Sequence, residues 1–221
     1  MSTFSFVIPT YNHYNLLHAT LYDIYQKCSP VHEVIVVDDC STDQDYHDGL
    51  EWWKSNGMLP VRHIRMKENS MFLKASNAGL KRATGDIICL LSNDVRIHKD
   101  IVLDITGMVR AYENCLIGGR YLDFDTGWNT FGSVMFPYLE GWLLATSRKN
   151  WEELGYFDVQ YAPSDMEDVD LSATARMRGY HLLPLSPTST THIGGQSIGF
   201  NPEREKITIA NKEKFRQKWL E

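Results

Sequence analysis

The chain has 221 residues, 43% of them hydrophobic, and a formal net charge of −6. This length is enough to bury a core, and we expect one domain over residues 1–221. The charge and a sequence pI of about 5.7 disfavour a broad basic surface for nucleic acid. No apolar run approaches the roughly 18 residues of a membrane span, and the run at 4–9 has no basic residues before it. We therefore expect a soluble, cytoplasmic protein without a transmembrane segment.

Strand-like and helix-like segments alternate in the first half of the chain. The pattern predicts strands over 4–8, 33–38, 61–66 and 86–91, and helices near 13–27, 43–56, 72–83 and 98–113. After residue 115 come Gly-rich and aromatic segments, then a strand at 142–145, a short helix at 148–154 and a helix at 167–179. This alternation favours an α/β fold, a mixed but mostly parallel central sheet flanked by helices. We expect residues 1–115 to form a nucleotide-binding half and residues 116–221 an acceptor and catalytic half.

Two predicted strands end in polar side chains. The run 34–37 leads into Asp38 and Asp39, and the run 87–91 leads into Ser92, Asn93 and Asp94. Open parallel sheets bind their ligands at the carboxyl ends of the strands. Carboxylates there do not hold a bare phosphate by charge, but they bind a base or ribose, or a metal that bridges to phosphates. The sequence therefore predicts a site for a nucleotide and a metal.

Several blocks together resemble the inverting glycosyltransferases of family 2, which have the GT-A fold. The blocks lie at residues 6–12, 36–43, 74–79, 83–86, 92–94, 155–158, 167–171 and 192–195. They occur in the order of the family from residue 4 to about residue 199, so the resemblance covers most of the chain. It implies transfer of a sugar from a nucleoside diphosphate sugar to an acceptor hydroxyl.

The resemblance also implies the donor-binding residues. A tight turn after the first strand can place N–H groups and an aromatic ring against a nucleobase, although Asn12 could instead be a plain helix N-cap. Asp39 is expected to accept the imide N–H of a pyrimidine, whereas Asp38 could cap the next helix. The full set of predicted donor contacts is Pro9, Thr10, Tyr11, Asn12, Asp39, Lys74, Asn77, Asn93 and Trp142.

The metal ligands implied by the resemblance are Asp94 and His192, for Mn²⁺ or Mg²⁺. Asn93 replaces the first acid of the D-x-D-like motif of the family, so an amide carbonyl or water has to complete the shell. Literal D-x-D patterns occur at 43–45, 123–125 and 168–170, but position in the fold favours Asp94. A structural histidine is the alternative for His192, and the following glycine pair, which permits close backbone approach, favours the site.

Glu167 and Asp168 open the helix predicted at 167–179, whose Leu171, Ala175 and Met177 are expected to pack inward. Carboxylates at its amino end can then point into a cleft. The alternative is complementarity to the helix dipole, worth only about 0.3–1 kcal/mol. The resemblance implies that Asp168 is the general base toward the acceptor hydroxyl, with Glu167 as a second catalytic carboxylate.

These assignments predict an inverting, metal-dependent glycosyltransferase that uses a UDP- or dTDP-sugar. A surface glycan or polysaccharide is the expected acceptor, reached where needed by peripheral contact with a membrane. A modified nucleic-acid base stays open as an acceptor because basic residues crowd the last helix, at Lys206, Lys212, Lys214, Arg216 and Lys218. Asn93 also leaves open a catalytically decayed nucleotide-sugar binding module. A sugar-nucleotide pyrophosphorylase is disfavoured, because residues 9–12 lack the Gly-rich, basic loop of that class.

Overall fold

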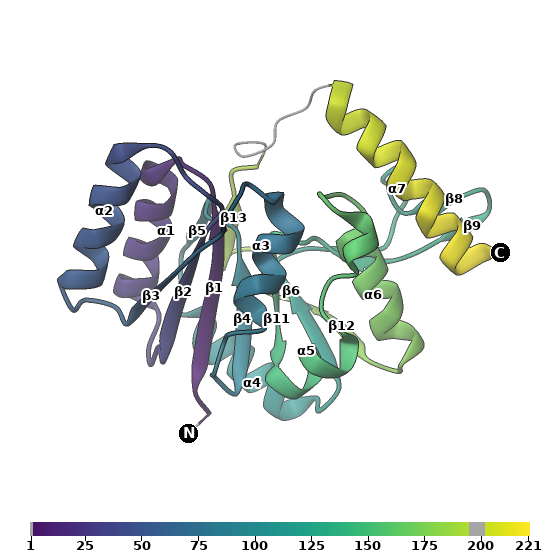
Figure 1. Cartoon of the computed structure of the whole chain (residues 1–221). Helices are drawn as coiled ribbons and strands as arrows, with labels where there is room; N and C mark the ends of the chain where they lie inside the picture. The colour runs from purple at the N-terminus through teal and green to yellow at the C-terminus, as the bar shows by residue number, and fades with distance from the viewer. Residues whose placement is uncertain (1, 195–201) are drawn as a thin grey trace.

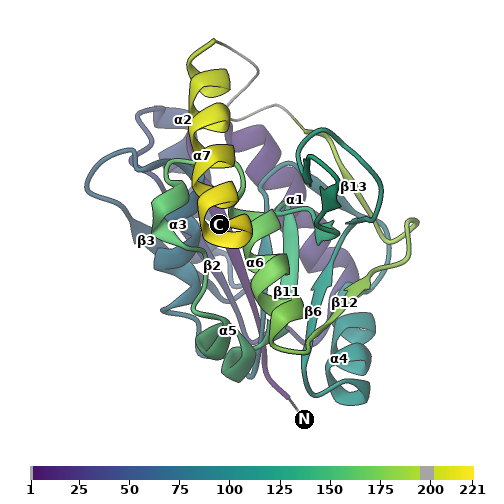
Figure 2. The same ribbon diagram turned by 90° about the vertical axis from the view of Figure 1, so that its right-hand side faces the viewer.

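The computed structural model describes residues 2–194 and 202–221. A seven-stranded sheet runs through the molecule, with helices on both faces (Figures 1 and 2). Its strands in spatial order are β12 (His181–Pro184), β6 (Cys115–Gly118), β11 (Leu143–Ser147), β4 (Ile87–Leu91), β1 (Phe4–Thr10), β2 (Glu33–Asp38) and β3 (Val61–Arg65). Only β11 is antiparallel to its neighbours in this sheet. The predicted mixed, mostly parallel α/β architecture is confirmed.

Each face of the sheet has its own apolar core, because successive strand residues point to opposite faces. In β1, Phe6 and Ile8 face one core and Val7 the other. The first core is covered by α1 (Tyr14–Lys27), α2 (Gln44–Ser55) and α4 (Ile101–Ala111). The second is covered by α3 (Met71–Leu80), α5 (Arg148–Leu154), α6 (Glu167–Met177) and α7 (Pro202–Leu220). Strands buried on both faces explain why their sequences are continuously apolar.

Helix α3 lies unusually close to the sheet, and Gly79 makes this approach possible. A Cβ at this position would lie 2.4 Å from Val7 Cγ1 and 2.7 Å from Val37 Cγ2. These are distances at which atoms have to move apart. The glycine therefore sets how tightly α3 packs on β1 and β2.

Three short strand pairs lie outside the main sheet. They are β5 (Val95–Ile97) with β13 (Thr190–His192), β7 (Tyr121–Leu122) with β10 (Tyr138–Leu139), and β8 (Thr130–Phe131) with β9 (Val134–Met135). The β8–β9 hairpin packs against α7, where the rings of Phe131 and Phe215 are stacked with centroids 5.0 Å apart. The 3-10 helix η1 (Val159–Tyr161) also contacts α7. The last helix is therefore tied to the second half of the fold.

The predicted elements agree with the structure to within a few residues. The helix predicted from residue 98 begins at Ile101, because the Asp100 side chain caps it by accepting hydrogen bonds from the N–H groups of Val102 and Leu103. Met177 was predicted to pack inward, and this was wrong: its side chain is 75% exposed at the end of α6. Among the described residues, no helix combines the length and apolarity needed to cross a bilayer. The division into residues 1–115 and 116–221 stays a prediction, although β6, β11 and β12 extend the sheet that β1 to β4 begin.

Candidate active site

A cavity of about 540 Å³ opens at the carboxyl ends of the parallel strands. Ten predicted site residues line it, namely Pro9, Thr10, Tyr11, Asp39, Asn93, Asp94, Trp142, Glu167, Asp168 and His192. Strand β1 lies between β2 and β4, so the chain order of the sheet reverses at this point. Such a switch point leaves a crevice in which doubly wound folds bind ligands. Because β11 runs antiparallel, the chain enters it at this same edge, and Trp142 therefore reaches the cavity.

The two carboxylates after β2 have different surroundings. Asp38 is fully buried and forms an ion pair with Arg65, and it also accepts a hydrogen bond from the Ser41 N–H at 2.7 Å. Burial by itself would raise the pKa of Asp38, but the neighbouring His63 ring, the hydrogen bonding of Ser41 and the Arg65 charge lower it to about 2. Asp38 is therefore a structural anion.

Asp39 lines the cavity instead. Its Oδ1 accepts hydrogen bonds from the Ser70 N–H at 2.9 Å and from the Ser70 hydroxyl at 2.8 Å. Its Oδ2 has no hydrogen-bond partner within residues 2–194 and 202–221. One carboxylate oxygen is thus held by the protein while the other is left for a ligand.

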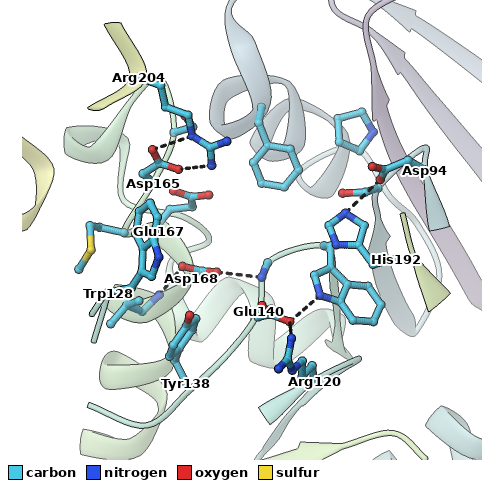
Figure 3. A pocket seen from close by; sticks show the side chains of 18 of the residues that line it. Asp94, Arg120, Trp128, Tyr138, Glu140, Asp165, Glu167, Asp168, His192 and Arg204 are labelled. Carbon is cyan, nitrogen blue, oxygen red and sulfur yellow. Dashed lines mark hydrogen bonds and ion pairs between the residues drawn. The ribbon is translucent and has the colours of Figure 1, made fainter. Parts of the chain in front are cut away.

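Asp94 and His192 come together although 98 positions separate them in the chain. Strand β13 pairs with β5, and His192 Nε2 lies 3.2 Å from Asp94 Oδ1 (Figure 3). The His192 ring stacks on Trp142 with centroids 5.1 Å apart. The Trp142 indole donates a hydrogen bond to Glu140 Oε2 at 2.9 Å. These contacts fix the imidazole against the carboxylate.

Gly119 has no side chain, and this leaves room for the Trp142 ring. A Cβ on this glycine would lie 1.9 Å from the indole. Any side chain there would therefore displace the ring on which His192 stacks.

The Asp94–His192 pair fits a divalent cation that receives its other ligands from a diphosphate and water. The pair offers one hard oxygen and one imidazole nitrogen. Asn93 lines the same cavity, and its Nδ2 donates a hydrogen bond to Thr10 Oγ1 at 3.0 Å. In the part of the chain that the structure describes, no three His, Cys, Asp or Glu side chains form a complete metal site. The described residues therefore provide an incomplete coordination shell.

Helix α6 places two carboxyl groups on the opposite side of the cavity. Asp165 and Met166 precede it with φ of 73° and 77°, and this left-handed turn directs the amino end of the helix at the cavity. Asp168 Oδ2 accepts a hydrogen bond from the Gly141 N–H at 2.9 Å. Burial raises the pKa of Asp168 to about 6, although the N–H groups of Gly141 and Val169 favour its ionised form. A carboxyl group with this pKa is half ionised near pH 6 and mostly ionised at neutral pH, so it is available for proton abstraction.

Glu167 is almost completely buried in the cavity wall. Its burial first, and then the neighbouring charge of Asp168, hold the pKa of Glu167 well above its usual range. Asp170, the third acid at the start of this helix, does not line the cavity. That side chain accepts hydrogen bonds from Tyr161 and Trp219 and pairs with Lys218, away from the cavity.

Sequence reasoning missed several polar residues of the cavity wall. Among them are Arg120, Tyr138, Glu140, Asp165 and Arg204. The Arg204 guanidinium donates two hydrogen bonds to the Asp165 carboxylate, at 2.8 and 3.1 Å (Figure 3). Arg120 lies 3.9 Å from Glu140. No local motif marks these residues; only the closeness of Asp165 to the acidic start of α6 was a usable signal.

Three predicted donor contacts do not line this cavity. Asn12 accepts hydrogen bonds from the N–H groups of residues 42 and 43, and His13 rather than Asn12 precedes α1 as its N-cap. Lys74 is exposed on α3. Asn77 is buried and its amide is satisfied by the backbone of Phe157, at 2.8 and 3.1 Å. Asn12 and Asn77 thus join segments of the fold and Lys74 lies on the surface, while a role of these three residues in donor binding stays a prediction.

The D-x-D patterns at 43–45 and 123–125 also lie elsewhere. Asp123 and Asp125 are exposed, and Asp125 accepts a hydrogen bond from the Gly127 N–H. Asp43 caps α2. None of these carboxylates lines the cavity, which leaves Asp94 in the better position. The block at 192–195 is described only as far as Gly194.

The fold and the site together define the class of the protein. The doubly wound sheet with a cavity at the carboxyl ends of its strands is the GT-A architecture, which similar solved glycosyltransferases share. The family model described as "Glycosyl transferase family 2" matches residues 5–169, and the chain belongs to this family.

Similar proteins support this assignment. The poly(ribitol-phosphate) beta-N-acetylglucosaminyltransferase TarS of Staphylococcus aureus is 30% identical over 116 residues, which are 52% of this chain and 20% of TarS. The mannosyltransferase PcManGT of Pyrobaculum calidifontis, solved with GDP-Man and Mn²⁺, superposes with a TM-score of 0.70 at 21% identity, over 88% of this chain and 58% of PcManGT. GalNAc-T7, solved with UDP, GalNAc and Mn²⁺, gives a TM-score of 0.75 at 17% identity, over 91% of this chain and 45% of GalNAc-T7. In each case the chain spans less than two thirds of the similar protein.

Proposed function

We propose that the chain transfers a sugar from a nucleoside diphosphate sugar to a hydroxyl of a glycan acceptor and inverts the anomeric centre. One observation carries this proposal: the Asp168 carboxylate and the Asp94–His192 pair face one cavity from opposite sides (Figure 3). A single displacement needs a base on the acceptor side and charge neutralisation on the leaving group. The two sides of this cavity meet those needs separately.

The proposed step has one bond made and one broken. The acceptor oxygen forms a bond to the anomeric carbon while the bond from that carbon to the diphosphate oxygen breaks, and its electron pair leaves with the nucleoside diphosphate. Asp168 takes the acceptor proton, and the Gly141 N–H holds the carboxylate in place. A divalent cation, when bound by Asp94 and His192, would supply positive charge to the diphosphate. Because attack and departure occur on opposite faces of the carbon, the configuration inverts.

The donor end is proposed at the first half of the chain. Asp39 lines the cavity beside Pro9, Thr10 and Tyr11, and one of its carboxylate oxygens has no partner within the described residues, which suits recognition of a pyrimidine imide. We therefore propose a UDP- or dTDP-sugar as donor and Mn²⁺ or Mg²⁺ as cofactor. Similar proteins solved with GDP-Man or with UDP, in both cases with Mn²⁺, support a nucleotide-sugar donor and Mn²⁺. We propose that residues 116–221 form the half of the protein that binds the acceptor. The proposed acceptor is a surface glycan or polysaccharide, including one presented at a membrane.

A nucleic-acid acceptor is not favoured by the last helix. Its basic side chains already have partners within the protein: Lys206 with Glu203, Lys212 with the Gly127 carbonyl, Lys214 with the Gln160 carbonyl, Arg216 with Glu213, and Lys218 with Asp158. Their charges are therefore largely used internally. This fits a solvated helix face better than a surface for phosphates.

A nucleotide screen tests the proposal. UDP, dTDP, GDP and CDP, and their common sugars, are added with and without Mn²⁺, and the melting temperature is measured, because a ligand that binds the native state raises it. We expect a metal-dependent rise for a uridine or thymidine nucleotide, and release of that nucleotide from its sugar when acceptor is present. Binding without any turnover would instead indicate a decayed binding module.

A further inference from the structure

One carboxyl group in the cavity has no use in the reaction described above. Glu167 is only 7% exposed, yet its side chain lines the cavity. Its Oε2 is buried and has no hydrogen-bond partner within the described ranges 2–194 and 202–221. Buried polar atoms are nearly always paired, so an unpaired carboxyl group in the wall of a ligand cavity points to a partner on the ligand.

The charges around Glu167 determine whether its carboxyl group is neutral or ionised. Its neighbours are the carboxylates of Asp165 and Asp168, and Figure 3 shows its carboxyl group between theirs. The nearby Arg204 guanidinium makes two hydrogen bonds to Asp165. A third negative charge in this buried space would be repelled by both neighbours and would lose its water. The neutral acid is therefore the stable form, in agreement with the raised pKa of Glu167.

A neutral carboxyl group differs from a carboxylate in what it can bind. It carries one O–H donor, whereas a carboxylate only accepts. A donor that lies beside the base on the same helix end suits the oxygen of a second acceptor hydroxyl. Asp168 binds the hydroxyl that attacks, and Glu167 binds its neighbour.

We propose that Glu167 is a protonated hydrogen-bond donor that binds an acceptor hydroxyl adjacent to the attacking one, so that the acceptor is a sugar or polyol with two neighbouring hydroxyls. This inference rests on the proposed function. It assigns Glu167 to acceptor recognition, and the base remains Asp168 alone.

The protonation state is tested first. Carboxyl carbons are labelled with ¹³C in the intact chain, and the Glu167 signal is assigned by its loss in Glu167→Gln. We expect this signal at the chemical shift of a neutral acid at pH 7, without titration between pH 6 and pH 8. A signal at the shift of a carboxylate would overturn the inference.

Acceptor recognition is tested by kinetics with defined probes. The probes are methyl glycosides of glucose, galactose, mannose and N-acetylglucosamine, with their monodeoxy analogues, and the donor is the nucleotide sugar that the native protein turns over. We expect Glu167→Ala to lower kcat/KM for the acceptor by about 3- to 15-fold, the range for one neutral hydrogen bond. Glu167→Gln keeps an N–H donor and should recover most of this loss. The matched control is Glu152→Ala, an exposed glutamate on α5, which should change nothing.

The deoxy probes distinguish this role from a structural one. A glycoside that lacks the hydroxyl next to the attacked position should be used equally poorly by the native protein and by Glu167→Ala. A loss in Glu167→Gln as large as in Glu167→Ala would overturn the inference, as would a deoxy probe that stays sensitive to Glu167→Ala. UDP binding, measured by calorimetry, should be unchanged in both variants.

The two levels of proposal fail differently. A native protein that turns over no nucleotide sugar would overturn the proposed function, and the inference with it. A transferase whose Glu167 is ionised, or whose acceptor needs no second hydroxyl, would overturn the inference alone.

Discussion

Asp168 Oδ2 lies 2.9 Å from the backbone nitrogen of Gly141, which donates a hydrogen bond to it. The contact joins the start of α6 to the segment that leads into β11. A Cβ on Gly141 would lie only 3.3 Å from the Asp168 Cβ, so the absence of a side chain lets the two segments approach. The orientation of the proposed base is therefore set by the sheet and does not depend on α6 alone.

Asp168→Asn removes the proposed base with little change of shape. We expect transfer to fall by about 10²- to 10⁴-fold, while donor affinity stays within about twofold, because the base acts on the acceptor. Steady-state transfer and calorimetric titration with donor measure the two effects. Asp45→Asn, an exposed position on α2, is the control for the substitution itself. Transfer at the native rate in Asp168→Asn would refute the assignment.

The raised pKa of Asp168 also predicts a pH dependence of stability. An acid with a native pKa of about 6 and an unfolded pKa of 3.8 binds more protons in the native state between these values. As the pH rises from about 4 to about 6, the free energy of unfolding of the unsubstituted protein therefore falls relative to that of Asp168→Asn. Above about pH 6 the difference between the two proteins stays constant. Urea unfolding of both proteins at pH 4, 5, 6 and 7.5 measures it. A difference independent of pH would show that the pKa of Asp168 is not raised.

Asp39→Ala tests the donor side. We expect the dissociation constant of the donor to rise by about 10-fold or more, the effect of losing a hydrogen bond to a charged group, while turnover of bound donor changes less. The substitution also frees Ser70, so Ser70→Ala is the matched control, since it loses a hydrogen bond to Asp39 but keeps the carboxylate. Equal donor affinity in Asp39→Ala and the native protein would contradict the assignment.

Asp94→Asn tests the metal site. Chelation of divalent ions should remove most transfer, added Mn²⁺ should restore it, and the variant should need about 10-fold more Mn²⁺ because a carboxylate is a stronger ligand than an amide. Asp125→Asn changes an exposed member of a literal D-x-D pattern and should leave the Mn²⁺ requirement unaltered. The opposite ranking of the two variants would move the metal to residues 123–125.

Two helix glycines provide a matched test of packing. Gly79→Ala places a Cβ 2.4 Å from Val7, and we expect a loss of about 1–3 kcal/mol in the free energy of unfolding despite the better helix propensity of alanine. Gly107→Ala on α4 meets nothing within 4 Å and should gain about 0.5–1 kcal/mol. Denaturant unfolding measures both. A stabilising Gly79→Ala would show that α3 can move off the sheet freely.

The success of the sequence predictions depends on how local their physical causes are. The strands and the polar residues that follow them were predicted because strands buried on both faces leave continuous apolar runs that end abruptly, as before Asp39 and Asp94. The family resemblance predicted that Asp94 and His192 belong to one site. Local sequence does not show this, because the contact depends on the pairing of β5 with β13.

The errors have equally physical causes. Asn77 belongs to a helix with an apolar face, and only the tertiary structure shows that its amide binds the backbone of Phe157. Arg120 and Arg204 reach the cavity from segments with no motif, because their positions depend on how β7 and α7 pack. The fold and the centre of the candidate site were therefore predictable, whereas the part of the cavity wall that contains Arg120 and Arg204 was not.

The single antiparallel strand has a consequence for how this protein can diversify. Because β11 runs against its neighbours, the chain arrives at the cavity edge between β6 and β11 through residues 119–142, which add no strand to the main sheet. Lengthening or shortening the middle of this stretch would not alter the register of the seven strands, whereas its two ends are held by Gly119, Gly141 and Trp142, which position the His192 ring and the Asp168 carboxylate. The parallel strands form a constant frame, and the middle of the segment between β6 and β11 is the part of the cavity wall that can vary.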